Sequence, residues 1–182
     1  MSKSAAKILS TAEQLFNQHS FNAVGVDLIR DESGCSKTTL YTYFKNKQQL
    51  VAAVLQKRDT HFRQSLSDFV GDTQDLAALE KIFDWHVLWF QQDHFKGCLF
   101  VRAVAESNQD DQDIISISKA HKQWIKVLIA QNCNIPNGEA LSELIYTVIE
   151  GLISRFLVDG FDETLAINMK NSINQLFNIH QH

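Results

Sequence analysis

The sequence predicts an all-α fold of about nine helices, and three observations carry that prediction. The 182 residues include a single proline and seven glycines, so few positions would interrupt a helix. Apolar residues recur three and four positions apart through most of the chain, which is the spacing of an amphipathic helix. Hydrophobic residues make up 45% of the chain, enough to bury a sizeable core.

The N-terminal part of the sequence predicts three helices. The first has its apolar residues at helical spacing and runs to about His19. A second, very short helix covers 26–32 and stops at Gly34, a residue that accepts a positive φ. Ser36 can cap a third short helix over 37–44. Two short helices joined by a glycine-containing turn predict a helix-turn-helix.

The rest of the chain predicts a long connecting helix and five more. Asn46 can cap the fourth helix, with Gln49 at the capping-box position, and apolar residues continue it toward Phe69. A boundary follows at 71–73, and Pro136 separates the last two helices from the others. Those five helices are expected within the segments 76–90, 98–107, 114–128, 141–157 and 165–177.

Charge is distributed unevenly along the chain. The net charge is −4, but residues 1–63 carry nine Lys and Arg against five Asp and Glu, a net +4, which leaves −8 for the remainder. Local charge rather than net charge steers association, so this asymmetry fits a module that approaches phosphates joined to a body that does not.

Cysteine usage and hydropathy indicate the compartment. Cys35, Cys98 and Cys133 are widely spaced and form no CxxC motif, which favours neither a disulfide framework nor a zinc site. The first residues have no apolar signal-like run, and no stretch of about 18 uncharged apolar residues could span a bilayer. We therefore expect a cytoplasmic protein in a reducing compartment, without a membrane partner.

Enzyme chemistry is not indicated. The sequence holds none of the GxSxG, GxxxxGK[ST] and HExxH motifs that would carry a nucleophile, a phosphate or a metal. His86, His94 and His121 lack metal-ligand spacing. We expect no enzyme, no cofactor and no metal.

One run of residues carries a family resemblance. From Gly34 to Lys47 the sequence has a Gly-Cys-Ser turn, a Thr-Leu-Tyr segment, an aromatic pair and an Asn-Lys helix start. This run resembles the TetR family of bacterial transcriptional regulators. The segments 24–27 and 95–100, with Ala105-Glu106 after them, resemble the AcrR-like branch of that family.

Two positions depart from the family pattern. The family often has Thr or Ser where Gly25 stands, so a phosphate contact there would rest on backbone N–H groups alone. Asp27, in the first turn of the second helix, suits the helix dipole but would repel a nearby phosphate. Cys35 replaces the usual Val of the turn, and a buried Cys behaves as a small hydrophobe.

The resemblance implies a domain organisation and a function. Residues 1–48 would form a helix-turn-helix DNA-binding domain, and residues 49–182 a helical domain for effector binding and dimerisation. The implied protein is a homodimeric, ligand-responsive repressor that binds a palindromic double-stranded DNA operator and an unknown small-molecule effector. The alternatives are an activator, a small-molecule-binding or adaptor protein of the same fold that does not regulate transcription, and an enzyme.

The third helix carries the residues expected to contact DNA. It is too short to be stable alone, so Leu40 and Phe44 must face inward and the polar residues outward. Read against the family, the base-edge candidates are Lys37, Thr38 and Tyr41, and the phosphate candidates are Thr39, Tyr41, Thr42, Tyr43 and Lys47. Lys47 would add its charge to the positive end of the fourth helix. The alternative is that the tyrosines complete a core and the lysines form a solvated face.

The body supplies two further sets of candidates. The effector cavity implied by the family would be lined by the aromatic-rich residues Trp85, His86, Trp89, Phe100, Arg102 and Trp124. The apolar faces of the last two helices are too wide for one-sided packing, which predicts a four-helix dimer interface. Its residues would be Leu141, Ile145, Val148, Leu152, Phe156, Met169, Ile173 and Phe177. For both sets, the alternative is an ordinary intrachain core.

Overall fold

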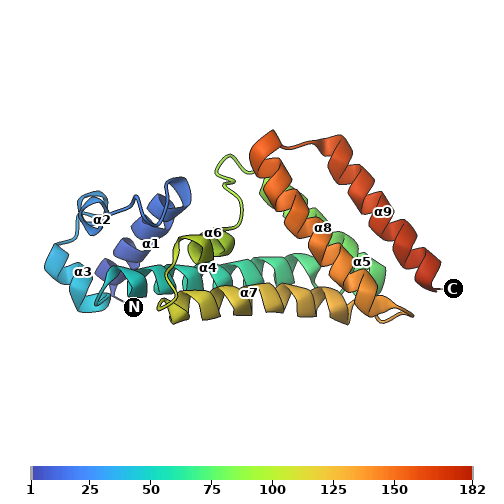
Figure 1. The fold of residues 1–182 in the computed structure, drawn as a ribbon, viewed down its shortest axis with the longest axis horizontal. Helices are drawn as coiled ribbons and strands as arrows, with labels where there is room; N and C mark the ends of the chain where they lie inside the picture. Colours follow the sequence, from blue (N-terminus) through green and yellow to red (C-terminus); the bar gives the residue numbers. More distant parts are fainter. Residues whose placement is uncertain (1, 182) are drawn as a thin grey trace. The chain divides into compact units, whose positions relative to one another are not determined.

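The computed structural model describes residues 2–181, and over that range the chain is all-α (Figure 1). The predicted fold class is confirmed, as is the number of helices in the described residues. The helices are α1 (Lys3–Gln18), α2 (Val26–Ser33), α3 (Lys37–Tyr43), α4 (Lys47–Val70), α5 (Asp75–Phe90), α6 (Leu99–Glu106), α7 (Gln112–Gln131), α8 (Gly138–Asp159) and α9 (Glu163–Gln181).

The helices group into two compact units, each built from two stretches of chain. The first unit is the chain up to His61 together with Cys98–His121, and the second is Phe62–Gly97 together with the chain from Lys122. These limits differ from the domain boundary expected after residue 48, and that boundary stays a prediction. Helix α6 and half of α7 therefore accompany the N-terminal helices.

The ends of the first three helices follow from local chemistry. The Ser2 hydroxyl accepts a hydrogen bond from the Ala5 N–H at 3.2 Å and caps α1. Gly34 ends α2 with φ of +59°, a conformation that costs a residue with a Cβ. The Ser36 hydroxyl accepts from the Thr39 N–H at 3.0 Å and caps α3. The turn at Gly34 and the Ser36 cap expected from the sequence are thus present.

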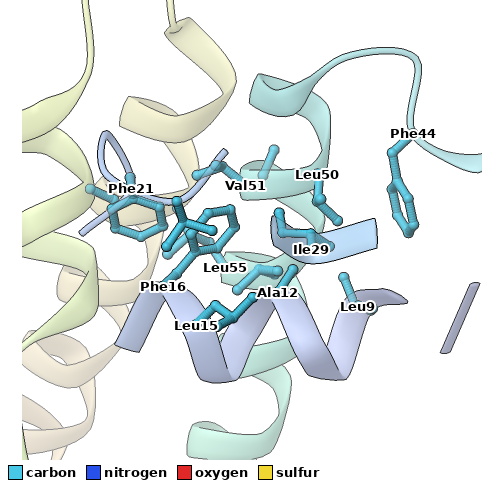
Figure 2. Close-up of a cluster of buried hydrophobic side chains, with 14 of the residues drawn as sticks. Leu9, Ala12, Leu15, Phe16, Phe21, Ile29, Phe44, Leu50, Val51 and Leu55 are labelled. Atoms are coloured by element: carbon cyan, nitrogen blue, oxygen red, sulfur yellow. The ribbon is translucent and has the colours of Figure 1, made fainter. Parts of the chain in front are cut away.

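The core of the first unit is aromatic at its centre. Phe16 of α1 and Phe21, three residues beyond that helix, lie with ring centroids 4.9 Å apart. Figure 2 shows them among apolar side chains of α2 and α4, including Ile29, Leu50 and Leu55. Ile29 of α2 and Leu40 of α3 belong to this core. Because helices this short are not stable alone, α2 and α3 depend on the core for stability.

Helix α6 is tied to the end of α1 by polar contacts. Arg102 donates hydrogen bonds to the carbonyl oxygens of His19 at 2.7 Å and Asn17 at 3.1 Å, which are orphan acceptors at a helix C-terminus. One turn later, a Glu106 carboxylate oxygen accepts from the Asn22 N–H at 2.9 Å. These contacts fix α6 against the N-terminal helices.

In the second unit, α5 packs against both α8 and α9, and α8 packs against α9 (Figure 1). Lys170 of α9 forms an ion pair with Asp84 of α5 at 2.7 Å. Phe90 of α5 and Phe156 of α8 meet edge-on with centroids 5.3 Å apart. An ion pair between α5 and α9 and a contact between two aromatic rings of α5 and α8 thus help to hold these helices together.

Two of the longer helices bury only part of their apolar surface. On α7, Ile125 and Ile129 are buried, whereas Trp124 and Leu128 are only half-buried. The aromatic ring of Trp124 instead lies under the Arg63 guanidinium. On α5, Leu88 is 54% exposed.

Candidate nucleic-acid interface

Helix α3 presents a polar outer face on an apolar support. Leu40 is fully buried and Phe44, which follows the last turn, is buried as well. The exposed side chains of α3 are those of Lys37, Thr38, Tyr41, Thr42 and Tyr43, and Thr39 is half-buried. Helix α3 contacts α1 and α2, which fix its direction. The prediction that Leu40 and Phe44 face inward, with the polar residues of α3 outward, is confirmed by these exposures.

The two tyrosines of α3 do not belong to the core. Tyr41 is 43% and Tyr43 45% exposed. A tyrosine that only filled a core would be buried with its hydroxyl partnered, so the alternative given above does not hold for this pair. Their rings and hydroxyls stand at the surface, where a large polar partner can reach them.

Two of the candidate hydroxyls bond within their own helix. The Thr42 hydroxyl donates to the Thr38 carbonyl oxygen at 2.8 Å. The Thr39 hydroxyl shares a 2.8 Å hydrogen bond with the hydroxyl of Ser36. A hydroxyl has only one proton, so Thr42 must leave the Thr38 oxygen before it can donate to a phosphate oxygen.

Lys47 begins α4 and lies in a small hollow. Asn46 caps that helix, because its side-chain oxygen accepts from the Gln49 N–H at 2.8 Å. The hollow has a volume of about 80 Å³ and is lined by Lys47, Glu106 and residues from both stretches of the first unit. Burial lowers the pKa of the Lys47 ammonium, and the Glu106 charge opposes that shift. Lys47 thus combines a charge with a helix N-terminus, as expected.

A charge network that the sequence did not reveal joins α2 to α3. One oxygen of the Asp27 carboxylate lies 2.7 Å from the Arg30 guanidinium and 3.0 Å from the Lys37 ammonium. Arg30 also donates two hydrogen bonds to Asp31, at 2.8 and 3.0 Å. The i, i+3 spacing of Asp27 and Arg30 was the available signal, but the Lys37 contact depends on the turn between the helices.

The expected effector residues are divided between the two units. Trp85, His86, Trp89 and Trp124 lie in the second unit, and Phe100 and Arg102 lie in the first. Arg102 holds the end of α1, as described above. Phe100 stacks on the imidazole of His121 with centroids 3.7 Å apart, and His121 Nδ1 lies 2.8 Å from an Asp59 carboxylate oxygen. These two candidates thus have partners within their own unit.

The aromatic cluster of the second unit surrounds a histidine. His86 is 1% exposed, and its Nδ1 lies 2.7 Å from the Ile82 carbonyl oxygen, which assigns the proton to Nδ1. Burial lowers the pKa of His86 to about 4, so the imidazole is neutral near pH 7. Phe62 of α4, which the sequence did not single out, faces Trp85 with centroids 4.6 Å apart. The Trp85 indole N–H donates to the Ser65 hydroxyl at 3.1 Å.

Most of the residues expected at a dimer interface are buried within this one chain. Leu141, Ile145, Leu152, Phe156, Ile173 and Phe177 are buried, and Val148 and Met169 are half-buried. Other apolar residues of α8 and α9 remain exposed. They are Leu144, Leu157, Val158, Ile167 and Ile179.

Neither a metal centre nor a membrane span is found in the described residues. Within them, no group of three or more His, Cys, Asp and Glu side chains could hold a metal ion. No helix of residues 2–181 has the length and apolarity that crossing a bilayer requires.

The α2–α3 pair and its glycine turn form a helix-turn-helix, the class of motif that places its second helix in a DNA groove. The model of bacterial regulatory proteins of the tetR family matches residues 8–54. A TetR-family transcriptional regulator from Streptomyces coelicolor, SCO4454, has the same fold, with a TM-score of 0.88 over 100% of this chain and 91% of that one at 24% identity. Residues 8–54 thus match the tetR family of bacterial regulatory proteins, and the chain as a whole has the fold of a TetR-family regulator.

Two curated relatives carry named activities. The transcriptional activator FasR of Mycolicibacterium smegmatis is 36% identical over 84 residues, which cover 43% of this chain and 38% of FasR. The transcriptional repressor NemR of Escherichia coli is 25% identical over 130 residues, 68% of this chain and 64% of NemR. The chain thus matches less than two thirds of the length of either relative.

Proposed function

We propose that this protein is a ligand-responsive repressor that binds a palindromic DNA operator as a homodimer. The outward polar face of α3 carries the proposal. Exposed Lys37, Thr38 and Tyr41 suit base edges in a major groove, while Thr42, Tyr43 and Lys47 suit the flanking phosphates. Buried Leu40 fixes the helix from behind, so the face is preorganised for docking.

The dimer is proposed to form through the outward sides of α8 and α9. Leu144, Leu157 and Val158 of α8 and Ile167 and Ile179 of α9 are exposed apolar residues, and Val158 is 80% exposed. A symmetric pair of such helices would bury them as a four-helix interface. The buried residues Leu141, Ile145, Leu152 and Phe156 would support that surface from behind rather than touch the partner.

Repression is proposed over activation because occluding a promoter needs only binding, whereas activation needs a further contact with the transcription machinery. The named activities of the relatives include one activator, FasR, and one repressor, NemR, so activation is the second candidate. We further propose a cytoplasmic protein without enzyme activity. An adaptor that has lost DNA binding would not need the exposed α3 face.

A selection experiment tests the DNA-binding proposal. The purified chain is mixed with a library of random duplexes of roughly 30 base pairs, long enough for two half-sites one helical turn apart. Enrichment of a palindromic sequence, bound by a species of twice the chain mass in light scattering, supports the proposal. Failure to enrich any sequence at low salt contradicts it.

The effector part of the proposal has its own measurement. A ligand that prefers the native state must raise the apparent melting temperature, so a small-molecule library is screened by thermal shift. Hits are then tested for release of the enriched duplex. A library in which no compound shifts melting and none releases DNA would favour a constitutive repressor.

A further inference from the structure

The charge network at the start of the recognition helix α3 involves four side chains of α2 and α3. Asp27, in the first turn of α2, places a single carboxylate oxygen 2.7 Å from the Arg30 guanidinium and 3.0 Å from the Lys37 ammonium. Arg30 forms a second ion pair with the Asp31 carboxylate, at 2.7 Å. Two positive and two negative charges meet, so the network is neutral.

The position of Lys37 makes this contact important. Lys37 is the first residue of α3 and the only basic side chain of that helix. Its side chain is 47% exposed, and the Asp27 side chain is 61% exposed, so DNA can reach both. In a helix-turn-helix, the N-terminal residues of the second helix contact base edges. A carboxylate therefore stands beside the one ammonium group that α3 can place there.

We propose that Asp27 is a specificity-determining residue, which holds the Lys37 ammonium for a guanine edge and withholds it from phosphates. This inference rests on the proposed DNA-binding function. An ammonium has three N–H donors, so Lys37 can keep one on Asp27 and offer two to the O6 and N7 acceptors of guanine. A phosphate must instead approach the carboxylate, whose charge repels it.

The consequence is a difference between specific and non-specific binding. Non-specific binding depends almost entirely on phosphate neutralisation, and Asp27 cancels one of the charges available for it. Specific binding keeps the hydrogen bonds from Lys37 to the base edge, so it loses less affinity to Asp27 than non-specific binding does. Asp27 thus lowers the affinity of the protein for every DNA sequence, but it does so least for a site in which a guanine meets Lys37. The ratio of specific to non-specific affinity is therefore higher with Asp27 than without it.

The test uses Asp27→Asn, with Asp31→Asn as the matched control and Lys37→Met as the partner variant. Dissociation constants are measured for the duplex that wild-type protein enriches from the random library and for a scrambled duplex of equal length, across a salt series. Asp27→Asn is expected to tighten scrambled-duplex binding by about three- to tenfold and to steepen its salt slope by about 0.9, the value of one phosphate contact. The affinity ratio of enriched to scrambled duplex falls accordingly.

The controls isolate the Asp27–Lys37 pair. Asp31→Asn removes the same charge from the network but no contact with Lys37, so it should leave the affinity ratio within about twofold of wild type. Asp27→Glu keeps the charge and should preserve most of the ratio. In the Lys37→Met background, Asp27→Asn should no longer change the ratio, because coupling requires both partners.

The outcomes separate the inference from the proposed function. An unchanged affinity ratio in Asp27→Asn, or an equal change in the Lys37→Met background, overturns the inference and leaves DNA binding intact. Wild-type protein that enriches no duplex overturns both. Melting curves of each variant accompany the binding data, and an exposed carboxylate is expected to move the melting temperature little.

Discussion

The α2–α3 segment of the first unit and the α5 segment of the second hold their candidate residues in opposite ways. On α3, only Leu40 is buried, and the polar side chains stand in solvent with short-range partners on α2 and α3. On α5, His86 is 1% exposed and lies among the rings of Phe62, Trp85 and Trp89. The first arrangement leaves its polar groups available to a partner, whereas the second satisfies them internally.

This difference separates stability from binding. Substitutions on the outer face of α3 should change affinity for DNA with little effect on folding, because exposed side chains contribute little to stability. Substitutions inside the aromatic cluster should change folding first. One residue of α3, the buried Leu40, should behave like the cluster.

Leu40→Ala is expected to have the largest effect. Leu40 is fully buried beneath α3, and removing a buried leucine side chain costs about 2–5 kcal/mol of folding stability. Because α3 is too short to persist without this contact, DNA binding should fall with it. Urea denaturation of wild type, Leu40→Ala and the exposed control Thr38→Ala gives the measurement. Similar midpoints for all three would mean that α3 is held by something other than Leu40.

His86 should make the stability of the protein depend on pH. Its pKa falls from 6.5 to about 4 on burial, so the unfolded state binds a proton that the folded state refuses. Stability is therefore complete above about pH 6.5 and is lost as the pH falls toward 4, by about 3 kcal/mol in all.

Comparison of two histidine variants isolates that contribution. His86→Gln removes the titrating group, so its stability relative to wild type should improve steadily as the pH falls from 7 to 4. His61 is exposed, and His61→Gln should keep the wild-type pH dependence. Parallel curves for wild type and His86→Gln would show that the imidazole is hydrated or protonated inside the fold.

Arg102→Met tests a residue that sequence reasoning placed in the effector site. Its guanidinium donates to the carbonyl oxygens of Asn17 and His19, so the variant should lose about 2 kcal/mol of stability, the range of a hydrogen bond to a charged group. Lys119→Met, an exposed substitution on α7, is the control. An unchanged stability in Arg102→Met, together with loss of effector response, would return Arg102 to the effector site.

The outward face of α3 could be predicted because its signals are local. Ser36 is the N-cap residue of α3, and Gly34 permits the turn before it. Leu40 and Phe44 are four residues apart, so the direction of each α3 side chain follows from the sequence alone. The contact between Asp27 and Lys37 could not be predicted, since it depends on the angle at which the turn sets one helix on the other.

The body was harder to predict for a physical reason. Wide apolar faces on α8 and α9 indicate only that much surface is buried, and Leu152 and Phe156 turned out to be covered within the chain while Val158 was not. Aromatic composition likewise does not distinguish a core from a binding cavity, because both are lined by the same residues. Only packing against other helices assigns such residues, and that packing is non-local.

Lys47→Ala should produce the smallest effect among these variants and the most diagnostic one. Lys47 is half-buried at the start of α4 beside Glu106, so its ammonium can meet a phosphate where the helix N-terminus already favours negative charge. Removal of the ammonium should weaken binding to the enriched and the scrambled duplex by a similar factor. It should also reduce the salt slope of binding by about 0.9, with little change in sequence preference. Lys45→Ala, an exposed neighbour outside the predicted set, is the control. A change in sequence preference in Lys47→Ala would instead place this lysine at a base edge, and the division between base-reading and phosphate-binding residues on the two helices would have to be redrawn.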